Sequence, residues 1–229
     1  DLMLGPLEDM QKETSLPAKQ AQKLSVIHQS ALRLLNLINQ ILEFRKTETQ
    51  NKKLCVSKGN IAPLIYEIGL KYKELNQKTK IDFQIQIEKE EMLLFFDKEI
   101  ITIVLDNLIS NAIKYTEQGR VTLSLYQTIR NEVAYTEIKV SDTGYGISAE
   151  ALPHIFDRYY QESGKHQASG TGIGLALVKN LVTLHEGEIR AESMQNEGST
   201  FYISLLTDNI YPNALHADST EPIQIGAHV

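Results

Sequence analysis

Two glycine clusters separated by a polar loop constrain the fold of this chain more than any other feature of its sequence. The first has the sequence DTGYGI at residues 142–147 and follows a segment whose alternating side chains predict a strand. The second has the sequence GTGIGLA at residues 170–176 and leads into an amphipathic helix expected over residues 173–186. This part of the chain is therefore organised as strand, glycine turn, loop, glycine turn and helix.

The two clusters carry groups suited to a nucleotide. Asp142 continues the face of Ile138 and Val140, which we expect to be buried, and a buried carboxylate needs a hydrogen-bond donor as its partner. An ionised aspartate only accepts hydrogen bonds, so it suits the exocyclic amine of adenine and repels the carbonyl of guanine. Glycines before a helix let backbone N–H groups approach a phosphate, whose charge the helix dipole favours. Either cluster alone could be ordinary turn chemistry, but together they indicate a nucleotide site.

Two other nucleotide motifs do not fit. The sequence G-x-x-x-x-G-K-[ST] is absent, which excludes a P-loop. The second cluster follows a loop rather than a strand and lacks the spacing G-x-G-x-x-G, which argues against a dinucleotide fingerprint.

Composition narrows the class of protein. The hydrophobic fraction of 42% and the charged fraction of 23% are those of an ordinary globular protein. A net charge of −6 argues against nucleic acid as the main partner. The single cysteine, Cys55, excludes an intrachain disulfide, and we expect it to be a small buried hydrophobe. No apolar run is long enough to cross a bilayer, so membrane attachment is expected only through segments outside this chain.

The sequence of the first fifty residues predicts a helical hairpin, which forms the first domain, residues 1–50. Residues 2–13 suggest the end of a helix, broken around 14–18. A second helix is indicated by an apolar stripe at heptad spacing, which comprises Leu24, Ile27, Ala31, Leu34, Leu35, Ile38, Ile41 and Leu42. One hairpin cannot bury this stripe alone, so a dimeric four-helix bundle is expected. The alternative is that the stripe packs on the chain's own second domain.

The sequence of the second domain, residues 53–207, predicts an α+β fold. Its helices are expected to pack on one face of a largely antiparallel sheet, which makes a two-layer sandwich. Strands are expected at 54–56, 81–87, 92–96, 121–129, 132–142, 188–192 and 200–206. Helices are expected at 61–76, from the cap Asp97 to about Tyr115, and at 173–186. Residues 208–229 lack periodicity and predict a tail or linker.

The helix after Asp97 has a polar face. Asn107, Asn111 and Lys114 lie opposite its apolar positions at spacings of four and three residues, so one face presents two amides and an ammonium. Asparagine is a mediocre helix former, and two of them one turn apart suggest ligands.

With these features the chain resembles the catalytic core of a sensor histidine kinase of two-component systems, of the hybrid type. Residues 107–116 resemble the N box of that family, 142–147 its first glycine box, 155–160 its F box, 170–177 its second glycine box and 197–201 its last short motif. Residues 24–46 resemble the second dimerisation helix. The ATP-binding part resembles the fold shared with gyrase, mismatch-repair ATPases and the ninety-kilodalton heat-shock chaperone.

The resemblance implies ATP and Mg²⁺ as cofactors and assigns roles to individual residues. Asn111 would hold Mg²⁺ with help from Asn107, and Lys114 would contact phosphate; these three form the expected catalytic set. Residues 157–171 would form a mobile lid. The expected nucleotide-binding set is Tyr115, Asp142, Gly144, Gly146, Ile147, Phe156, Gly170, Thr171, Gly172, Ile173, Gly174, Leu175 and Thr200.

One departure concerns the phosphoacceptor. The family carries a histidine followed by an acidic residue and, four residues on, a proline, and no such motif is present. Residues 4–8 resemble the stretch directly after that motif in the family, so we expect the chain to begin just beyond it and to be unable to phosphorylate itself. His28 lies beside the apolar stripe and is expected to pack there; His154, His166 and His185 are expected to face solvent or make local hydrogen bonds.

The resemblance also implies a homodimer through the helical hairpin, transfer to the receiver domain of a response regulator, and a cytoplasmic domain of an inner-membrane sensor. Two other functions stay open. An ATP hydrolase like gyrase places a glutamate one turn before the metal-binding asparagine, where this chain has Asn107, which cannot take a proton from water. The second alternative is a nucleotide-sensing or scaffolding module that catalyses no reaction.

Overall fold

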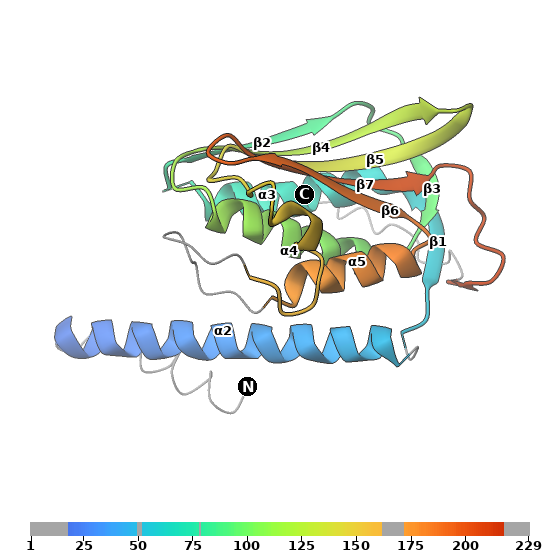
Figure 1. Cartoon of the computed structure of the whole chain (residues 1–229). Coiled ribbons are helices and arrows are strands. Elements are labelled where there is room, and N and C mark those ends of the chain that lie inside the picture. The colour runs from blue at the N-terminus through green and yellow to red at the C-terminus, as the bar shows by residue number, and fades with distance from the viewer. Residues whose placement is uncertain (1–17, 50–51, 78, 162–171, 218–229) are drawn as a thin grey trace, which may run out of the picture.

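A computed structural model describes residues 18–49, 52–77, 79–161 and 172–217. Figure 1 shows a sheet, a layer of helices beneath it, and a long separate helix, α2 (Ala18–Glu48), that runs below both. The first helix of the expected hairpin falls outside the described residues. Among the described helices, none is both long and apolar enough to cross a bilayer.

The main sheet has five strands in the order β2-β4-β5-β7-β6. All neighbouring strands are antiparallel except β2 and β4, which are parallel. The strands are β2 (Ile81–Ile87), β4 (Gly119–Arg130), β5 (Val133–Asp142), β6 (Glu188–Met194) and β7 (Gly198–Leu206). The predicted hairpin of β4 and β5 and the largely antiparallel sheet are confirmed.

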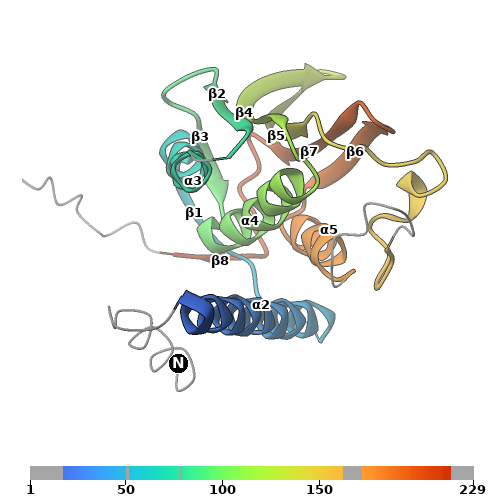
Figure 2. The ribbon, with the colours of Figure 1, turned by 90° about the vertical axis from the view of Figure 1, so that its left-hand side faces the viewer.

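Three helices cover one face of this sheet (Figures 1 and 2). They are α3 (Ile61–Leu75), α4 (Lys98–Lys114) and α5 (Gly174–Leu184). Their apolar positions, such as Val104 and Leu181, meet the inward residues of the strands, such as Ile138 and Val140, in one continuous core. The expected α+β sandwich is confirmed.

Asp97 starts α4 as predicted and also ties it to a neighbouring strand. Its Oδ1 accepts a hydrogen bond from the Ile100 amide at 3.0 Å, which caps the helix. Its Oδ2 accepts one from the amide of Cys55 at 2.9 Å. Because Leu54 and Val56 occupy the core face, Cys55 points outward, and the prediction that it is buried is wrong.

The segment 208–217, expected to belong to a tail, instead packs on the domain. β8 (Leu215–His216) pairs in parallel with β1 (Cys55–Asn60), which also pairs with β3 (Leu93–Phe96) in a small second sheet. Tyr211 is only 1% exposed, and its hydroxyl lies 3.0 Å from Nδ1 of His185. A single buried aromatic produces no periodicity, which is why the sequence pattern did not reveal this anchor.

His185 also differs from its prediction, which was that its side chain faces solvent or makes a local hydrogen bond. It is fully buried, and its Nε2 accepts a hydrogen bond from the amide of Asp97 at 2.9 Å. It therefore joins the end of α5 to the start of α4 and, through Tyr211, to the C-terminal segment.

The apolar stripe of α2 is largely exposed in the described structure. Leu24 and Phe44 are buried. The exposed members of the stripe are Ile27, Leu34, Leu35, Ile38, Ile41 and Leu42. The stripe as a whole therefore does not pack on the second domain, and the dimeric bundle stays a prediction.

Candidate nucleotide site

Asp142 ends β5 on the core-facing row of Ile138 and Val140, as predicted. Its Oδ1 accepts hydrogen bonds from the backbone amides of Gly144 at 2.9 Å and Ser199 at 3.3 Å. Among the described residues, its Oδ2 has no hydrogen-bond partner. Burial raises the pKa of Asp142, and the two amide donors partly oppose that rise. One oxygen is thus held by the fold while the other can accept a donor from a ligand.

The first glycine cluster packs tightly against the end of α4. A Cβ on Gly144 would lie 2.2 Å from the carbonyl oxygen of Tyr115, so no larger residue fits there without a backbone shift. The next amide, of Tyr145, donates to that same carbonyl at 3.1 Å. Gly146 has φ +66, and a Cβ there would lie 2.0 Å from the Met194 carbonyl oxygen. The first glycine cluster therefore lies directly against the backbone of Tyr115 at the end of α4.

The turn between β6 and β7 closes the other side of Asp142. The hydroxyl of Ser193 accepts a hydrogen bond from the amide of Ile147 at 2.8 Å, and Thr200 Oγ1 lies 2.7 Å from Ser141 Oγ. Gly198, with φ +115, approaches so closely that a Cβ there would meet the Asp142 carbonyl oxygen at 2.0 Å. Ile147 is thus tied to β6 through Ser193. Thr200 pairs with Ser141 rather than with Asp142, so its side chain lies on the opposite face of the sheet from the carboxylate, and the structure does not bring it into the expected site.

The polar face of α4 differs from the prediction at one residue. Asn107 is buried, with an exposed fraction of 8%, rather than lying on an open face. Its Nδ2 donates to the Ile103 carbonyl at 2.8 Å, and its Oδ1 accepts from Nε2 of Gln40 on α2 at 2.9 Å. Asn111 is half-buried, and Lys114 is exposed with its Nζ 4.8 Å from the ring centroid of Tyr115.

The second glycine cluster brings the start of α5 to the same face of α4. A Cβ on Gly174 would lie 3.0 Å from Oδ1 of Asn107. Ile173 precedes the helix and supplies no side-chain cap, whereas Leu175 packs against the core. Gly172, with φ +64, accepts a hydrogen bond at its carbonyl from the amide of Tyr159 at 2.8 Å. Gly170 and Thr171, with lid residues 162–171 as a whole, lie outside the described residues.

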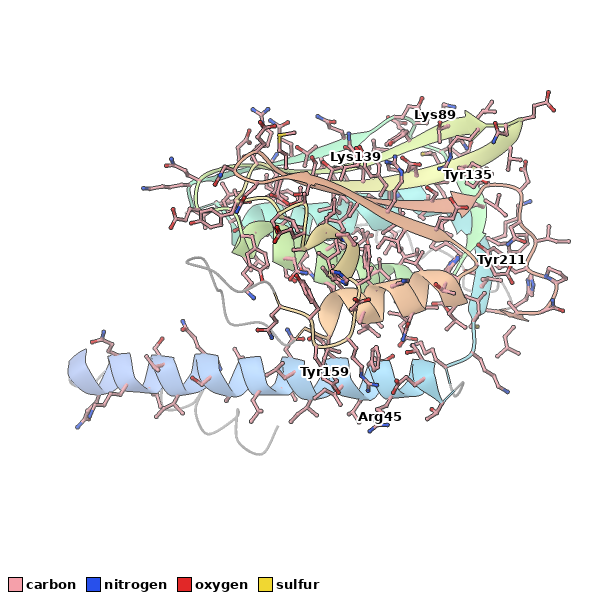
Figure 3. The ribbon with its side chains drawn as sticks, in the orientation of Figure 1. Arg45, Lys89, Tyr135, Lys139, Tyr159 and Tyr211 are labelled. Atoms are coloured by element: carbon pink, nitrogen blue, oxygen red, sulfur yellow. The ribbon has the colours of Figure 1, made fainter. Side chains whose placement is uncertain are left out.

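The F box fixes the start of the expected lid. Phe156 packs edge-on against Phe201 of β7 with ring centroids 6.3 Å apart, and Ile155 is buried beside it. Next along the chain come Arg158, whose guanidinium reaches α2, and Tyr159, labelled in Figure 3. His154 is exposed, as predicted, and lies 3.0 Å from Asp157.

Sequence reasoning missed three residues of the site. Ser199 donates a hydrogen bond to Asp142 through its backbone amide, which a residue of almost any type could do. The one signal in the sequence is Gly198 before it, because a glycine is needed where this turn approaches the backbone of Asp142. Gln40 and Arg158 act between domains, and such contacts leave no periodic signal in either segment.

A magnesium–adenine nucleotide suits these donors and acceptors. The open Oδ2 of Asp142 can accept from an exocyclic amine, and the uncapped start of α5 presents backbone N–H groups to a phosphate. The described residues hold no cluster of three or more His, Cys, Asp or Glu side chains that could bind a metal. A metal here would rely on amide oxygens and phosphate, which suits Mg²⁺ because it keeps several waters.

Comparison with known proteins identifies the family of this part of the chain. Residues 96–209 match the family described as histidine kinase-, DNA gyrase B- and HSP90-like ATPases. The chain is 34% identical over 210 residues to histidine kinase P4 of Formosa agariphila, covering 89% of this chain and 15% of that protein. It is 31% identical over 185 residues to the sensor histidine kinase WalK of Bacillus subtilis, covering 80% and 30%. The chain therefore spans less than a third of the length of these curated relatives.

One solved structure extends the likeness to the helical segment. Full-length ShkA in complex with AMPPNP superposes with a TM-score of 0.71 at 23% identity, over 88% of this chain and 41% of that one. At that identity the likeness concerns the fold.

Proposed function

The chain belongs to the sensor histidine kinases through its histidine kinase-type ATPase domain, and we propose that this domain binds Mg²⁺–ATP and transfers the γ-phosphate to a histidine. The acceptor histidine belongs to a dimerisation helix of the whole protein. From there the phosphoryl group passes to an aspartate in the receiver domain of a response regulator.

The single observation that carries this proposal is the arrangement of Asp142. Two backbone amides orient its carboxylate, and its second oxygen has no hydrogen-bond partner among the described residues. An ionised carboxylate in that position selects an exocyclic amine over a carbonyl, and hence adenine over guanine. Tyr115 offers its ring to the face of the base.

The remaining residues position the phosphates. Bound Mg²⁺ supplies charge neutralisation along the triphosphate. Asn111, with Asn107, offers amide oxygens to the metal, and Lys114 supplies a positive charge to phosphate oxygens. The backbone at residues 172–175 approaches the phosphates without side-chain hindrance at Gly172 and Gly174, and Phe156 holds the start of the lid.

Partners and location belong to the same proposal. The exposed stripe of α2 provides a surface for a second copy, as a homodimer requires. We place the domain in the cytoplasm as part of an inner-membrane sensor, attached through segments outside this chain.

Hydrolysis of ATP is the alternative. Water attack needs a general base near the metal, and this position is occupied by the amide of Asn107, which accepts no proton. We therefore favour transfer to histidine over transfer to water.

Isothermal titration calorimetry of the purified chain with ADP and with GDP, each with Mg²⁺ and with EDTA, tests the proposal. We expect ADP to bind more tightly with Mg²⁺ and GDP to bind at least roughly tenfold more weakly, the effect of one charge-assisted hydrogen bond. Equal affinities for the two bases would refute the role of Asp142.

A further inference from the structure

Three polar side chains form a row across the end of the sheet where the proposed nucleotide site lies. Asp142 of β5 pairs with Ser199 of β7, and Ser199 pairs with Ser193 of β6. Residues paired in this way place their side chains on the same face of the sheet, so all three lie on the face that the helices cover. Ser193 lies outside every segment that resembles a family motif, namely 107–116, 142–147, 155–160, 170–177 and 197–201.

The hydroxyl of Ser193 makes three hydrogen bonds. It accepts one from the amide of Ile147 at 2.8 Å and donates one to the carbonyl of Gly198 at 2.8 Å. Its Oγ also lies 2.9 Å from Oγ of Ser199. Because the single proton of Ser193 goes to the Gly198 carbonyl, the Ser199 hydroxyl is the donor in this third bond. One hydroxyl therefore connects the end of the first glycine cluster to the turn between β6 and β7.

These two segments are the ones that hold Asp142. The amide of Gly144 comes from the first glycine cluster and the amide of Ser199 from the start of β7, and both donate to Oδ1 of Asp142. The orientation of the carboxylate, and with it the direction in which Oδ2 faces, depends on how these two segments lie relative to each other. Hydrogen bonds weaken steeply as their angle departs from linearity, so a small rotation of the carboxylate would weaken a bond to a ligand at Oδ2.

We propose that Ser193 is a positioning residue for adenine binding: its hydroxyl joins the two segments that orient Asp142 and so keeps Oδ2 directed at the adenine amine. This inference rests on the proposed nucleotide site. Ser193 acts through Asp142 and makes no contact of its own with the nucleotide. A backbone hydrogen bond of 2.6 Å from the amide of Asn196 to the carbonyl of Tyr145 also joins the two segments. The fold of this region therefore does not depend on Ser193 alone, and its hydroxyl can be removed.

Two substitutions of Ser193 and one matched control provide the first test. Calorimetry should give an affinity for Mg²⁺–ADP about threefold to tenfold lower for Ser193→Ala than for wild type, the size of one hydrogen bond. Ser193→Thr keeps the hydroxyl and should stay within about twofold of wild type. Ser141→Ala is the control and should match wild type, because the Ser141 hydroxyl bonds Oγ1 of Thr200 on the opposite face of the same sheet end.

A double-mutant cycle with Asp142→Asn distinguishes positioning from a general loss of structure. Without the carboxylate there is no charged acceptor to orient, so Ser193→Ala should lower the affinity less than about twofold further in that background. A merely structural effect would lower it by the same factor in both backgrounds. Circular dichroism verifies that each variant is folded. Should Ser193→Ala not fold, Ser193→Cys takes its place in the cycle, because a thiol forms only weak hydrogen bonds.

Three results would overturn the inference while ADP binding by wild type upholds the nucleotide site. They are an unchanged affinity in Ser193→Ala, an equal loss in Ser193→Ala and Ser193→Thr, and the same loss factor with and without the Asp142 carboxylate. Failure of the wild-type chain to bind ADP would instead refute the proposed function and, with it, this inference.

Discussion

Asp142 holds two turns of the fold with one carboxylate oxygen and is proposed to bind adenine with the other. Its Oδ1 closes the turns at Gly144 and Ser199, so the carboxylate is oriented before any ligand arrives. A preoriented acceptor loses less entropy on binding than a mobile one. Substitution of Asp142 and its protonation should therefore both weaken nucleotide binding.

Asp142→Asn should weaken Mg²⁺–ADP binding by about 1.5–3 kcal/mol, the range for hydrogen bonds to charged groups. The mutant oxygen can still accept from the two backbone amides, but its NH₂ group then faces the adenine amine, donor against donor. Calorimetry measures the loss, and circular dichroism verifies the fold. Asp82→Asn is the control, because Asp82 is an exposed acid paired with Arg120 on β4; an equal loss in both variants would contradict the assignment.

The raised pKa of Asp142 predicts a pH dependence of binding. The ionised form is the stronger acceptor for the adenine amine, so affinity is highest above this pKa and falls as pH decreases through it. Because burial raises the pKa, the fall begins at higher pH than for an ordinary aspartate near 3.9. The ratio of wild-type to Asp142→Asn affinity, measured from about pH 8 down to the lowest pH at which both fold, cancels titration of the phosphates. A ratio independent of pH would speak against an ionised acceptor.

Among the helices and strands, sequence patterns predicted those whose apolar residues recur at regular spacing. They missed the features that depend on a single residue. The alternation of 81–87 and the apolar spacing of α4 indicated the main strands and helices, and Asp97 marked a helix start that the structure confirms. β8, Tyr211 and the buried His185 had no such signal, because each depends on one contact between distant segments. Asn107 was placed on an open face for the same reason: its cover, Gln40, comes from another domain.

Tyr211→Phe should destabilise the domain by about 1–3 kcal/mol. The Asp97 amide donates to Nε2 of His185, so Nδ1 carries the proton and donates to the Tyr211 hydroxyl. Removing that hydroxyl leaves a buried N–H without its acceptor. Urea unfolding followed by circular dichroism measures the change. Tyr66→Phe, on the exposed side of α3, should change stability by less than about 0.5 kcal/mol; similar losses in both would argue against the buried network.

At the scale of the whole molecule, α2 has two faces with different uses. One face contacts the ATP-binding domain through Gln40, Phe44 and Glu48. The other displays apolar side chains, among them Leu35, Ile38 and Leu42, that a second copy would cover. If a second copy covers that face, one helix would connect the proposed dimer to the proposed nucleotide site.

Phosphoryl transfer requires an acceptor histidine within reach of the bound nucleotide. The chain has no histidine followed by an acidic residue and, four residues on, a proline, so the 229-residue chain should bind ATP without labelling itself from γ-labelled ATP. Transfer needs reacting atoms roughly 3–3.5 Å apart, and half-buried His28 lies on the same helix that is docked on the domain. A longer chain that carries such a histidine on the preceding helix should become labelled, and the label should be lost in acid, because phosphohistidine is acid-labile whereas phosphoserine is not. Strong acid-labile labelling of the 229-residue chain that disappears in His28→Ala would instead make His28 the acceptor and overturn this prediction.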